Sequence, residues 1–262
     1  MAQTDDMIVL YDGLRNTDES ERPYSSRTLM VRYALCIKGI QHETFWVDWP
    51  DIATEATRVG APPTGERDGK PRYTVPFIYD PTTRRAISDS QTIIAYLETQ
   101  YPDTPCLFPP HTRALQAAFV QPEGADSVER RLLDAARPLF LARVLGTMTP
   151  RGREFLVDAY KRVTGAKAGL PAAEEERKEK IAEVLRVLDE VDGWLRGGEA
   201  DGPGVFFTGE APCNADVALA ATLTSLKNAS GKDSDVWQAI LTANGGRWAR
   251  YMDAFEPWYH VV

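Results

Sequence analysis

The sequence predicts an α/β domain with the element order β-α-β-α-β-β-α, followed by a region built of helices alone. Three observations support this fold class. Short apolar strands alternate with helical patterns over residues 8–101, a proline-bearing linker follows at 102–110, and no convincing strand occurs beyond it. We therefore expect one domain at 1–101, the linker at 102–110 and an all-helical domain at 111–262.

The first elements follow from local patterns. Residues 8–11 are a short apolar strand, and the serine pair Ser25-Ser26 precedes apolar side chains at helical spacing that end at Gly39. Residues 42–47 read as a second strand and 49–60 as a turn and a short helix. Residues 61–72, with three prolines and two glycines, predict a surface loop whose length indicates a function or a subunit contact.

The segment at residues 73–97, YTVPFIYDPTTRRAISDSQTIIAYL, is the most informative. Proline is disfavoured inside a strand, yet Pro76 interrupts an apolar run, and a cis Val75–Pro76 bond would reconcile the two. That turn would leave the main-chain N–H and C=O of Val75 facing outward, able to pair with an extended ligand. Residues 75–79 and 86–88 then form a hairpin.

A helix follows this hairpin from Ser90 to about Tyr101, with Asp89 immediately before it. Ser90 occupies the position expected of an N-cap. The N-terminus of a helix attracts negative charge, so this end is a candidate carboxylate site.

The remaining helices are predicted from apolar spacing and Gly/Pro breaks. They cover residues 114–119, 127–145, 151–163, 172–195, 215–230, 236–243 and 247–255.

Composition excludes several function classes. The net charge is −8 and no Lys/Arg stripe is present, which argues against a nucleic-acid partner. No apolar run is long enough for a membrane span, and MAQTDD lacks the features of a secretion signal, so a cytoplasmic protein without a membrane partner is expected. Three scattered cysteines and three histidines suggest neither a disulfide framework nor a metal site.

Ser25 has two possible roles. It or Ser26 caps the helix by accepting a main-chain hydrogen bond. Alternatively, the Ser25 hydroxyl, assisted by main-chain N–H groups and the helix dipole, donates to a thiolate placed at this helix end. A thiol ionises near pH 8.5, so lowering its pKa by about one or two units would leave much of it ionised in a cell.

These segments resemble the glutathione S-transferase superfamily, whose glutathione-binding domain is thioredoxin-like. The residue 23–35 segment PYSSRTLMVRYAL, with residues 44–52 and 60–78, is most similar to the fungal-specific class A transferases, which are related to bacterial β-etherases. By this resemblance Ser25 aligns with the catalytic serine, and a shift of one place would move that role to Ser26.

The resemblance also implies how glutathione binds. Val75, beside Pro76, would pair with the cysteinyl unit, while Ser90 and Asp89 would hold the γ-glutamyl carboxylate and amine. Tyr24 would line the thiol. No motif selects the cation for the glycyl carboxylate from the available candidates, which are Arg58, Arg67, Lys70 and Arg72.

The resemblance implies a serine-type glutathione transferase acting in detoxification, in which glutathione is co-substrate and a hydrophobic or aromatic molecule is the electrophile. It also implies a homodimer. Alternatives are a ligandin-type binding protein, a glutathione-dependent β-etherase and a non-catalytic interaction domain. A serine at position 25 argues against thioltransferase activity, because a mixed disulfide needs a cysteine there.

In the helical domain the family usually places a Ser or Thr three residues before a helical aspartate as a capping pair. Here the aspartate is Asp216 and the capping position holds Cys213. A thiol is a poor acceptor, so Asn214 could cap instead.

Overall fold

The computed structural model describes residues 7–120, 127–164, 173–198 and 204–262. The N-terminal MAQTDD segment, on which the expected lack of a secretion signal rests, lies outside these residues. The chain divides into two compact units. The first comprises Met1–Pro105, Thr147–Gly165 and Trp258–Val262, and the second Cys106–Gly146 and Ala166–Pro257. The predicted domain boundaries at 101 and 111 stay a prediction, because units defined by proximity do not test independent folding.

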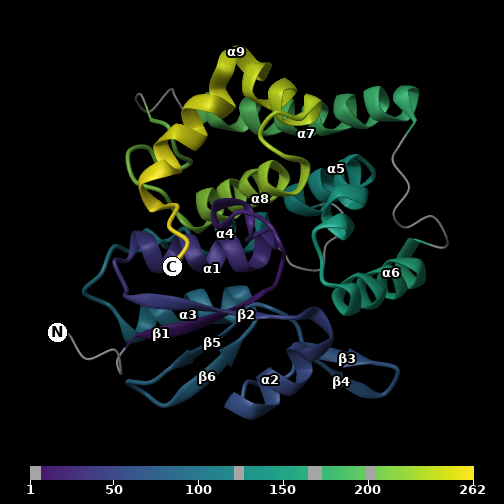
Figure 1. The fold of residues 1–262 in the computed structure, drawn as a ribbon. Coiled ribbons are helices and arrows are strands. Elements are labelled where there is room, and N and C mark those ends of the chain that lie inside the picture. The colour runs from purple at the N-terminus through teal and green to yellow at the C-terminus, as the bar shows by residue number, and fades with distance from the viewer. Residues whose placement is uncertain (1–6, 121–126, 165–172, 199–203) are drawn as a thin grey trace. The chain divides into compact units, whose positions relative to one another are not determined.

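The first unit contains the α/β elements in the predicted order (Figure 1). Its strands are β1 (Ile8–Gly13), β2 (His42–Val47), β3 (Gly65–Arg67), β4 (Lys70–Arg72), β5 (Phe77–Asp80) and β6 (Arg85–Ser88). Its helices are η2 (Glu19–Glu21), α1 (Ser26–Ile37), η3 (Trp49–Asp51), α2 (Ile52–Val59), α3 (Ser90–Gln100) and α6 (Pro150–Thr164). The main sheet has the order β2-β1-β5-β6, in which only β1 and β2 are parallel.

Helices cover both faces of this sheet, and the alternation of side chains in β1 explains why. Tyr11 of β1 and Phe77 of β5 point to the face covered by α2, where they stack with ring centroids 4.3 Å apart and pack with Ile52 and Ala56. Leu10 points to the opposite face, which α1 and α3 cover together (Figure 1).

Residues 61–72, predicted as a loop, contain the hairpin β3–β4, so that prediction is wrong in part. Asp68 and Gly69 form its two-residue turn, and both have positive φ angles, 52° and 71°. Such a turn matches the twist of an antiparallel pair, and Asp-Gly is its usual sequence.

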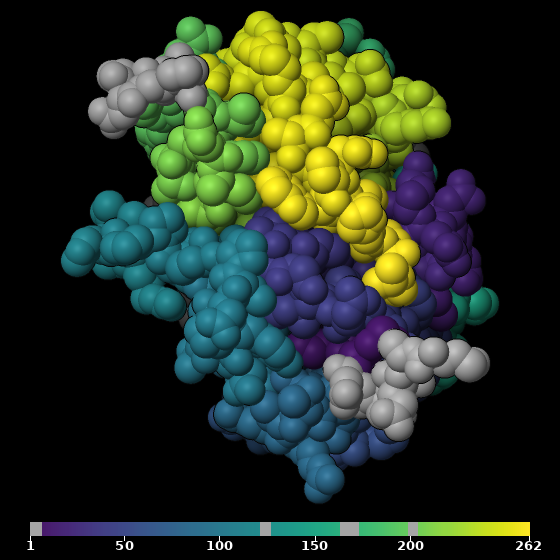
Figure 2. All heavy atoms as spheres, turned by 90° about the vertical axis from the view of Figure 1, so that its left-hand side faces the viewer, coloured from purple at the N-terminus to yellow at the C-terminus, as the bar shows by residue number. Residues whose placement is uncertain are grey.

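The last residues of the chain also belong to the first unit (Figure 2). The main-chain oxygen of Val262 accepts a hydrogen bond from Thr44 N at the edge strand β2. The Tyr259 ring lies 6.0 Å from Tyr33 of α1, and the His260 carbonyl accepts from the buried Arg32. These contacts cover part of α1, and the bond from Thr44 N provides a partner for one main-chain group at the open edge of β2.

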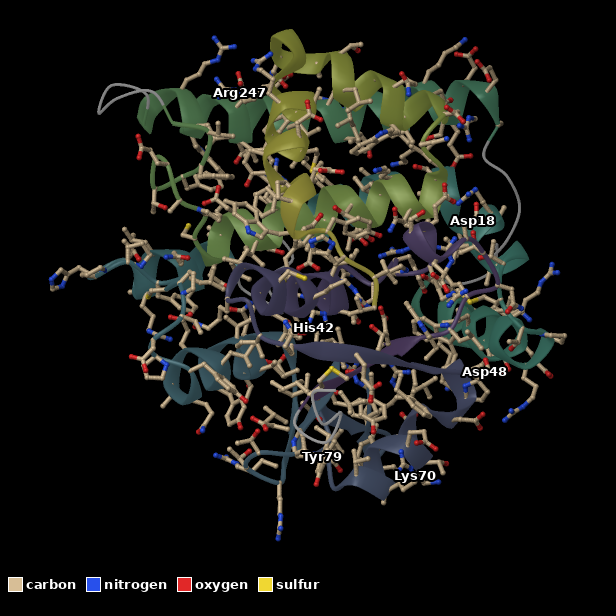
Figure 3. All side chains as sticks on the ribbon, turned by 60° about the vertical axis from the view of Figure 1, so that its left-hand side comes forward. Asp18, His42, Asp48, Lys70, Tyr79 and Arg247 are labelled. Carbon is tan, nitrogen blue, oxygen red and sulfur yellow. The ribbon has the colours of Figure 1, made fainter. Side chains whose placement is uncertain are left out.

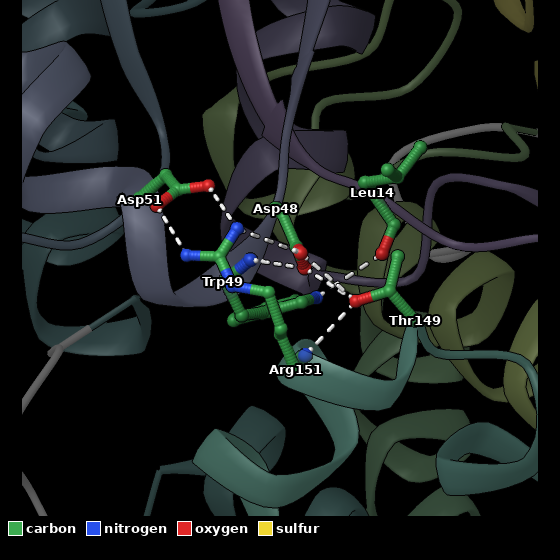
Figure 4. Close-up of polar contacts among 7 residues, drawn as sticks. Leu14, Asp48, Trp49, Asp51, Thr149 and Arg151 are labelled. Atoms are coloured by element: carbon green, nitrogen blue, oxygen red, sulfur yellow. Dashed lines mark hydrogen bonds and ion pairs between the residues drawn. The ribbon is translucent and has the colours of Figure 1, made fainter.

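Helix α6 is also attached to the first unit, although the sequence pattern predicts it as part of the helical domain. Thr149 precedes it, and the Thr149 Oγ1 accepts from Gly152 N at 2.9 Å while donating to the Asp48 carboxylate at 2.9 Å (Figure 4). Arg151 makes two hydrogen bonds to Asp51, of 2.8 and 3.0 Å. The start of α6 is therefore bonded to the turn between β2 and α2.

The second unit is helical in the residues that the structure describes. Its helices are α4 (Arg113–Phe119), α5 (Val128–Gly146), α7 (Glu174–Gly198), α8 (Asn214–Ser230) and α9 (Asp235–Phe255), and η5 (Glu256–Trp258) follows. α9 contains non-helical residues at 243–246, which agrees with the two helices predicted there. None of the described helices is long and apolar enough to cross a bilayer.

Helix α8 is buried along nearly its whole length and begins after Cys213. Asp216 accepts from Cys213 N and Phe207 N, both at 3.0 Å, and from the Tyr251 hydroxyl at 2.9 Å. Asn214 is the first residue of the helix, so the interpretation of Asn214 as the cap is wrong. Cys213 is the N-cap, and both halves of the capping box are present: its side chain accepts from Asp216 N, and the Asp216 carboxylate accepts from Cys213 N. The expectation that a thiol would not serve in the pair is therefore also wrong.

His42 gives the first unit a specific response to acid. This side chain is buried at the start of β2 (Figure 3), and its Nδ1 donates to the Ile40 carbonyl at 3.0 Å. Burial lowers the pKa of His42 to about 4, with smaller contributions from the charges of Arg32 and His260. Because the unfolded chain then binds a proton more readily, stability falls as the pH drops from about 6.5 towards 4.

We predict that His42 accounts for roughly 2.5 kcal/mol of the stability lost between about pH 7.5 and pH 4.5. The check is urea unfolding of the native protein and of His42→Gln at several pH values. The difference between the two proteins isolates His42, since Asp12, whose pKa burial raises to about 6, changes stability in the opposite direction. Parallel pH profiles would contradict the assignment.

The close approach of α6 to Asp48 predicts opposite effects of two glycine substitutions. A Cβ atom at Gly152 would lie 2.7 Å from Asp48 Oδ1, so Gly152→Ala should destabilise by about 1–3 kcal/mol. A Cβ atom at Gly193, inside α7, would meet no other atom within 4 Å, so Gly193→Ala should stabilise by about 0.5–1 kcal/mol. Urea unfolding of both variants measures the pair, and an equal effect at both positions would refute the contact.

Candidate functional site

A cavity of about 330 Å³ lies within the first unit, and Ser25 and Val75 both line it. One wall is apolar and comes from two segments. The first segment is η3 with the start of α2, which contributes Trp49, Pro50, Ile52 and Ala53. The second is helix α6, which contributes Phe155, Leu156 and Ala159. The rim nearest β3–β4 carries Arg67 and Arg72, followed by residues 73–74. The cavity therefore combines a serine, an aromatic wall and two guanidinium groups.

Ser25 is the N-cap of α1. Its extended backbone lies outside the helix, and its Oγ accepts from Thr28 N at 3.3 Å. This bond uses a lone pair, and no described residue accepts the hydroxyl hydrogen. Capping and donation to a ligand are therefore compatible in one side chain.

Unlike Ser25, its chain neighbours Tyr24 and Ser26 do not line the cavity. Ser26 is buried and does not line the cavity. The Tyr24 ring packs 5.7 Å from Trp49 and under the Arg15 guanidinium at 5.2 Å, and burial raises the pKa of its hydroxyl well above the usual value. Tyr24 is likewise absent from the cavity lining, so the structure does not bring it together with Ser25 and Val75.

The Val75–Pro76 peptide bond is cis, as predicted. β5 begins one residue later, at Phe77, so the proline lies outside the ladder and costs it no hydrogen bond. Neither the N–H nor the C=O of Val75 bonds to another described residue, although the residue is only 9% exposed. An extended ligand in the cavity could pair with both groups.

The cap of α3 is Asp89, which corrects the assignment of Ser90 to that position. Asp89 has a φ of 73°, and its carboxylate accepts from Thr92 N at 3.0 Å and Thr92 Oγ1 at 3.1 Å. A carboxylate at this end also interacts favourably with the helix dipole. Ser90 is the first helical residue, is 2% exposed, and its Oγ bonds to none of the described residues. Neither residue lines the cavity.

Of the four candidate cations for the glycyl carboxylate, two line the cavity and two do not. Arg58 is paired with Glu55 at 2.7 Å, and Lys70 lies at the turn of β3–β4 without lining the cavity. Arg67 and Arg72 line it, and neither makes an ion pair with a described carboxylate. No group of three or more potential metal ligands occurs within the described ranges.

Sequence reasoning missed the apolar wall. The sequence pattern predicts Trp49 only as part of a turn, but its ring lies so close to Gly13 that a Cβ there would be 2.4 Å away, and its Nε1 donates to the Leu14 carbonyl at 3.2 Å (Figure 4). Phe155 and Leu156 fit the pattern of an ordinary helix. The aromatic residues among positions 45–49 could have indicated that Trp49 lines a pocket. Nothing in the local sequence of α6 indicates that Phe155 and Leu156 do so.

Comparison with known proteins identifies chains of similar sequence and fold. The chain is 32% identical to the glutathione transferase GSTFuA3 of Phanerochaete chrysosporium, with a TM-score of 0.87 over 99% of both chains. It is 33% identical to a glutathione S-transferase of Ceriporiopsis subvermispora solved in complex with glutathione, with a TM-score of 0.86 over 98% of this chain and 99% of that one. It is also 27% identical to the glutathione S-transferase-like protein ustS of Aspergillus flavus, over 95% of this chain and 89% of that protein.

Two family models match as well. Residues 23–100 match the glutathione S-transferase N-terminal domain and residues 114–258 match the C-terminal domain. The thioredoxin-like order of the first elements and the helical remainder are the architecture of these proteins. The chain belongs to the glutathione S-transferase family.

Proposed function

We propose that this protein is a serine-type glutathione transferase, in which Ser25 stabilises the glutathione thiolate for attack on an apolar or aromatic electrophile. The observation that carries the proposal is the Ser25 hydroxyl. It caps α1, lines the cavity and has a hydrogen that no described residue accepts. Its neighbour Ser26 is buried away from the cavity, which supports Ser25 as the catalytic serine.

The chemistry requires a thiolate at the start of α1. The Ser25 hydroxyl donates a hydrogen bond to the sulfur, and the positive end of the helix dipole adds a favourable interaction. Each unit by which the thiol pKa falls corresponds to about 1.4 kcal/mol of preference for the anion. The thiol proton leaves to solvent, the sulfur forms a bond to the electrophilic carbon, and the leaving group departs with its electron pair.

The rest of glutathione is held by three groups of this chain. The cysteinyl unit pairs with the main chain of Val75, next to the cis Pro76. The γ-glutamyl end approaches α3, where the buried Ser90 Oγ has an open bonding position and the Asp89 carboxylate can face the amine. Arg67 or Arg72 binds the glycyl carboxylate, since both line the cavity. Tyr24 acts in this proposal through its packing on Trp49.

The apolar wall supports an aromatic acceptor. Trp49 and Phe155 both line the cavity, and Phe155 is 46% exposed, so its ring is accessible to a ligand. The same wall supports the second candidate, a ligandin-type protein that holds aromatic molecules with little turnover. β-Etherase chemistry requires the same activated thiolate. The homodimer, the cytoplasmic location and the role in detoxification stay predictions.

Ser25→Ala tests the first candidate. Loss of a charge-assisted hydrogen bond of about 1.5–3 kcal/mol should lower kcat/KM roughly 10- to 150-fold with a chromogenic electrophile. The pH profile of the variant should move about one to two units towards higher pH, because the thiol of bound glutathione ionises less readily without this hydrogen bond. Thiolate absorbance in the binary complex measures that pKa directly.

Two controls complete this experiment. Ser26→Ala should leave the pH profile unchanged. If Ser26→Ala shifts the profile and Ser25→Ala does not, Ser26 is the residue that stabilises the thiolate. Since Ser25 also caps α1, thermal unfolding and retention on immobilised glutathione establish that Ser25→Ala is folded. If the native protein binds glutathione but turns over no electrophile, the ligandin candidate replaces the transferase, and failure to bind glutathione would exclude both.

A further inference from the structure

The hairpin β3–β4 presents its positive charges on one face. Arg67 is paired with Lys70 and Gly65 with Arg72 across the ladder. Directly opposed residues, and residues two apart on one strand, share a face of a β-ribbon. Arg67, Lys70 and Arg72 therefore lie on the same face, with Gly65 adding no side chain.

The acidic residue within the strands lies on the other face. Glu66 is paired with Pro71, one position out of phase with the three cations. The second acidic residue, Asp68, lies in the turn, where a φ of 52° takes it out of the strand alternation. The ribbon thus has one cationic face rather than a mixed surface.

This face is turned to the cavity. Arg67 and Arg72 both line it, and Figure 3 shows Lys70 on the same hairpin. None of the three cations makes an ion pair with a described carboxylate, in contrast to Arg151 with Asp51 and Arg58 with Glu55. Two of these three cations line the cavity, in a chain whose net charge is −8.

Glutathione accounts for only part of this charge. Its γ-glutamyl carboxylate belongs to the α3 end in the function proposed above, which leaves the glycyl carboxylate for one guanidinium. The remaining arginine lines the cavity that Trp49 and Phe155 also line, and Lys70 lies on the same face of the hairpin without lining the cavity itself. A molecule that satisfies both sides of this space is an aromatic ring bearing an acidic group.

We propose that the acceptor of this enzyme is an aromatic electrophile carrying a carboxylate, selected by the cationic face of β3–β4. The inference rests on the proposed transferase function. Because the cations are exposed, the selection is a modest one that salt weakens, since charges near a protein surface are screened over about 8–10 Å at ordinary ionic strength.

The test compares two acceptors of the same shape, 4-chloro-3,5-dinitrobenzoate and the corresponding benzamide, at saturating glutathione. Each kcat/KM is divided by the rate of the uncatalysed reaction with glutathione. We expect the acid to be favoured by about tenfold at low salt, and the preference to shrink as salt is added. Arg67→Gln, Lys70→Gln and Arg72→Gln, singly and combined, should each reduce this ratio.

Glu66→Gln is the matched control. It changes one charge on the same hairpin but on the opposite face, so the acid-to-amide ratio should not change. An equal response to Glu66→Gln and Lys70→Gln would overturn the role of the cationic face. Turnover of both acceptors at equal corrected rates would overturn the inference and leave the transferase standing, whereas turnover of neither, nor of any neutral electrophile, would count against the transferase itself.

Discussion

The turn between β2 and α2 is the constraint on which the cavity depends. Asp48 accepts from Trp49 N and Thr149 Oγ1, so one carboxylate closes η3 and holds the start of α6. The Trp49 ring is fixed at the same turn by its contact with Gly13 and its bond to Leu14. If this turn moved, both segments of the apolar wall would move with it, because each is attached to it directly.

The N-termini of α1 and α3 carry two of the candidate site residues, Ser25 and Asp89. Four main-chain N–H groups at the start of any helix lack a partner within it, and a capping side chain satisfies one of them. Ser25 and Asp89 do this for α1 and α3, which fixes their side-chain positions before any ligand binds. Both candidate groups are therefore held by bonds that the fold already requires, which would limit the entropy lost if they bind a ligand.

Prediction from sequence succeeded where the controlling interaction is local. The cis bond before Pro76 and the start of α1 after Ser25 follow from the residues themselves. The β3–β4 hairpin was missed although Asp68-Gly69 is its local signal, because the prolines around it suggested a loop. The cap of α3 differed by one residue, as Ser90 and Asp89 are both good caps and only the backbone angle separates them. Attachment of α6 could not be predicted, since Thr149 and Asp48 lie 101 residues apart.

That attachment has a consequence for how such enzymes diversify. Ser25 and the apolar wall belong to one compact unit, even though α6 follows more than forty residues of the helical unit in the chain. A recombination that exchanged everything after the linker would replace α6 while keeping Asp48 and Asp51, and the new helix would meet carboxylates without their Thr149 and Arg151 partners. The apolar wall of the cavity can therefore be inherited intact only when the segment that contains α6 is inherited together with the turn between β2 and α2.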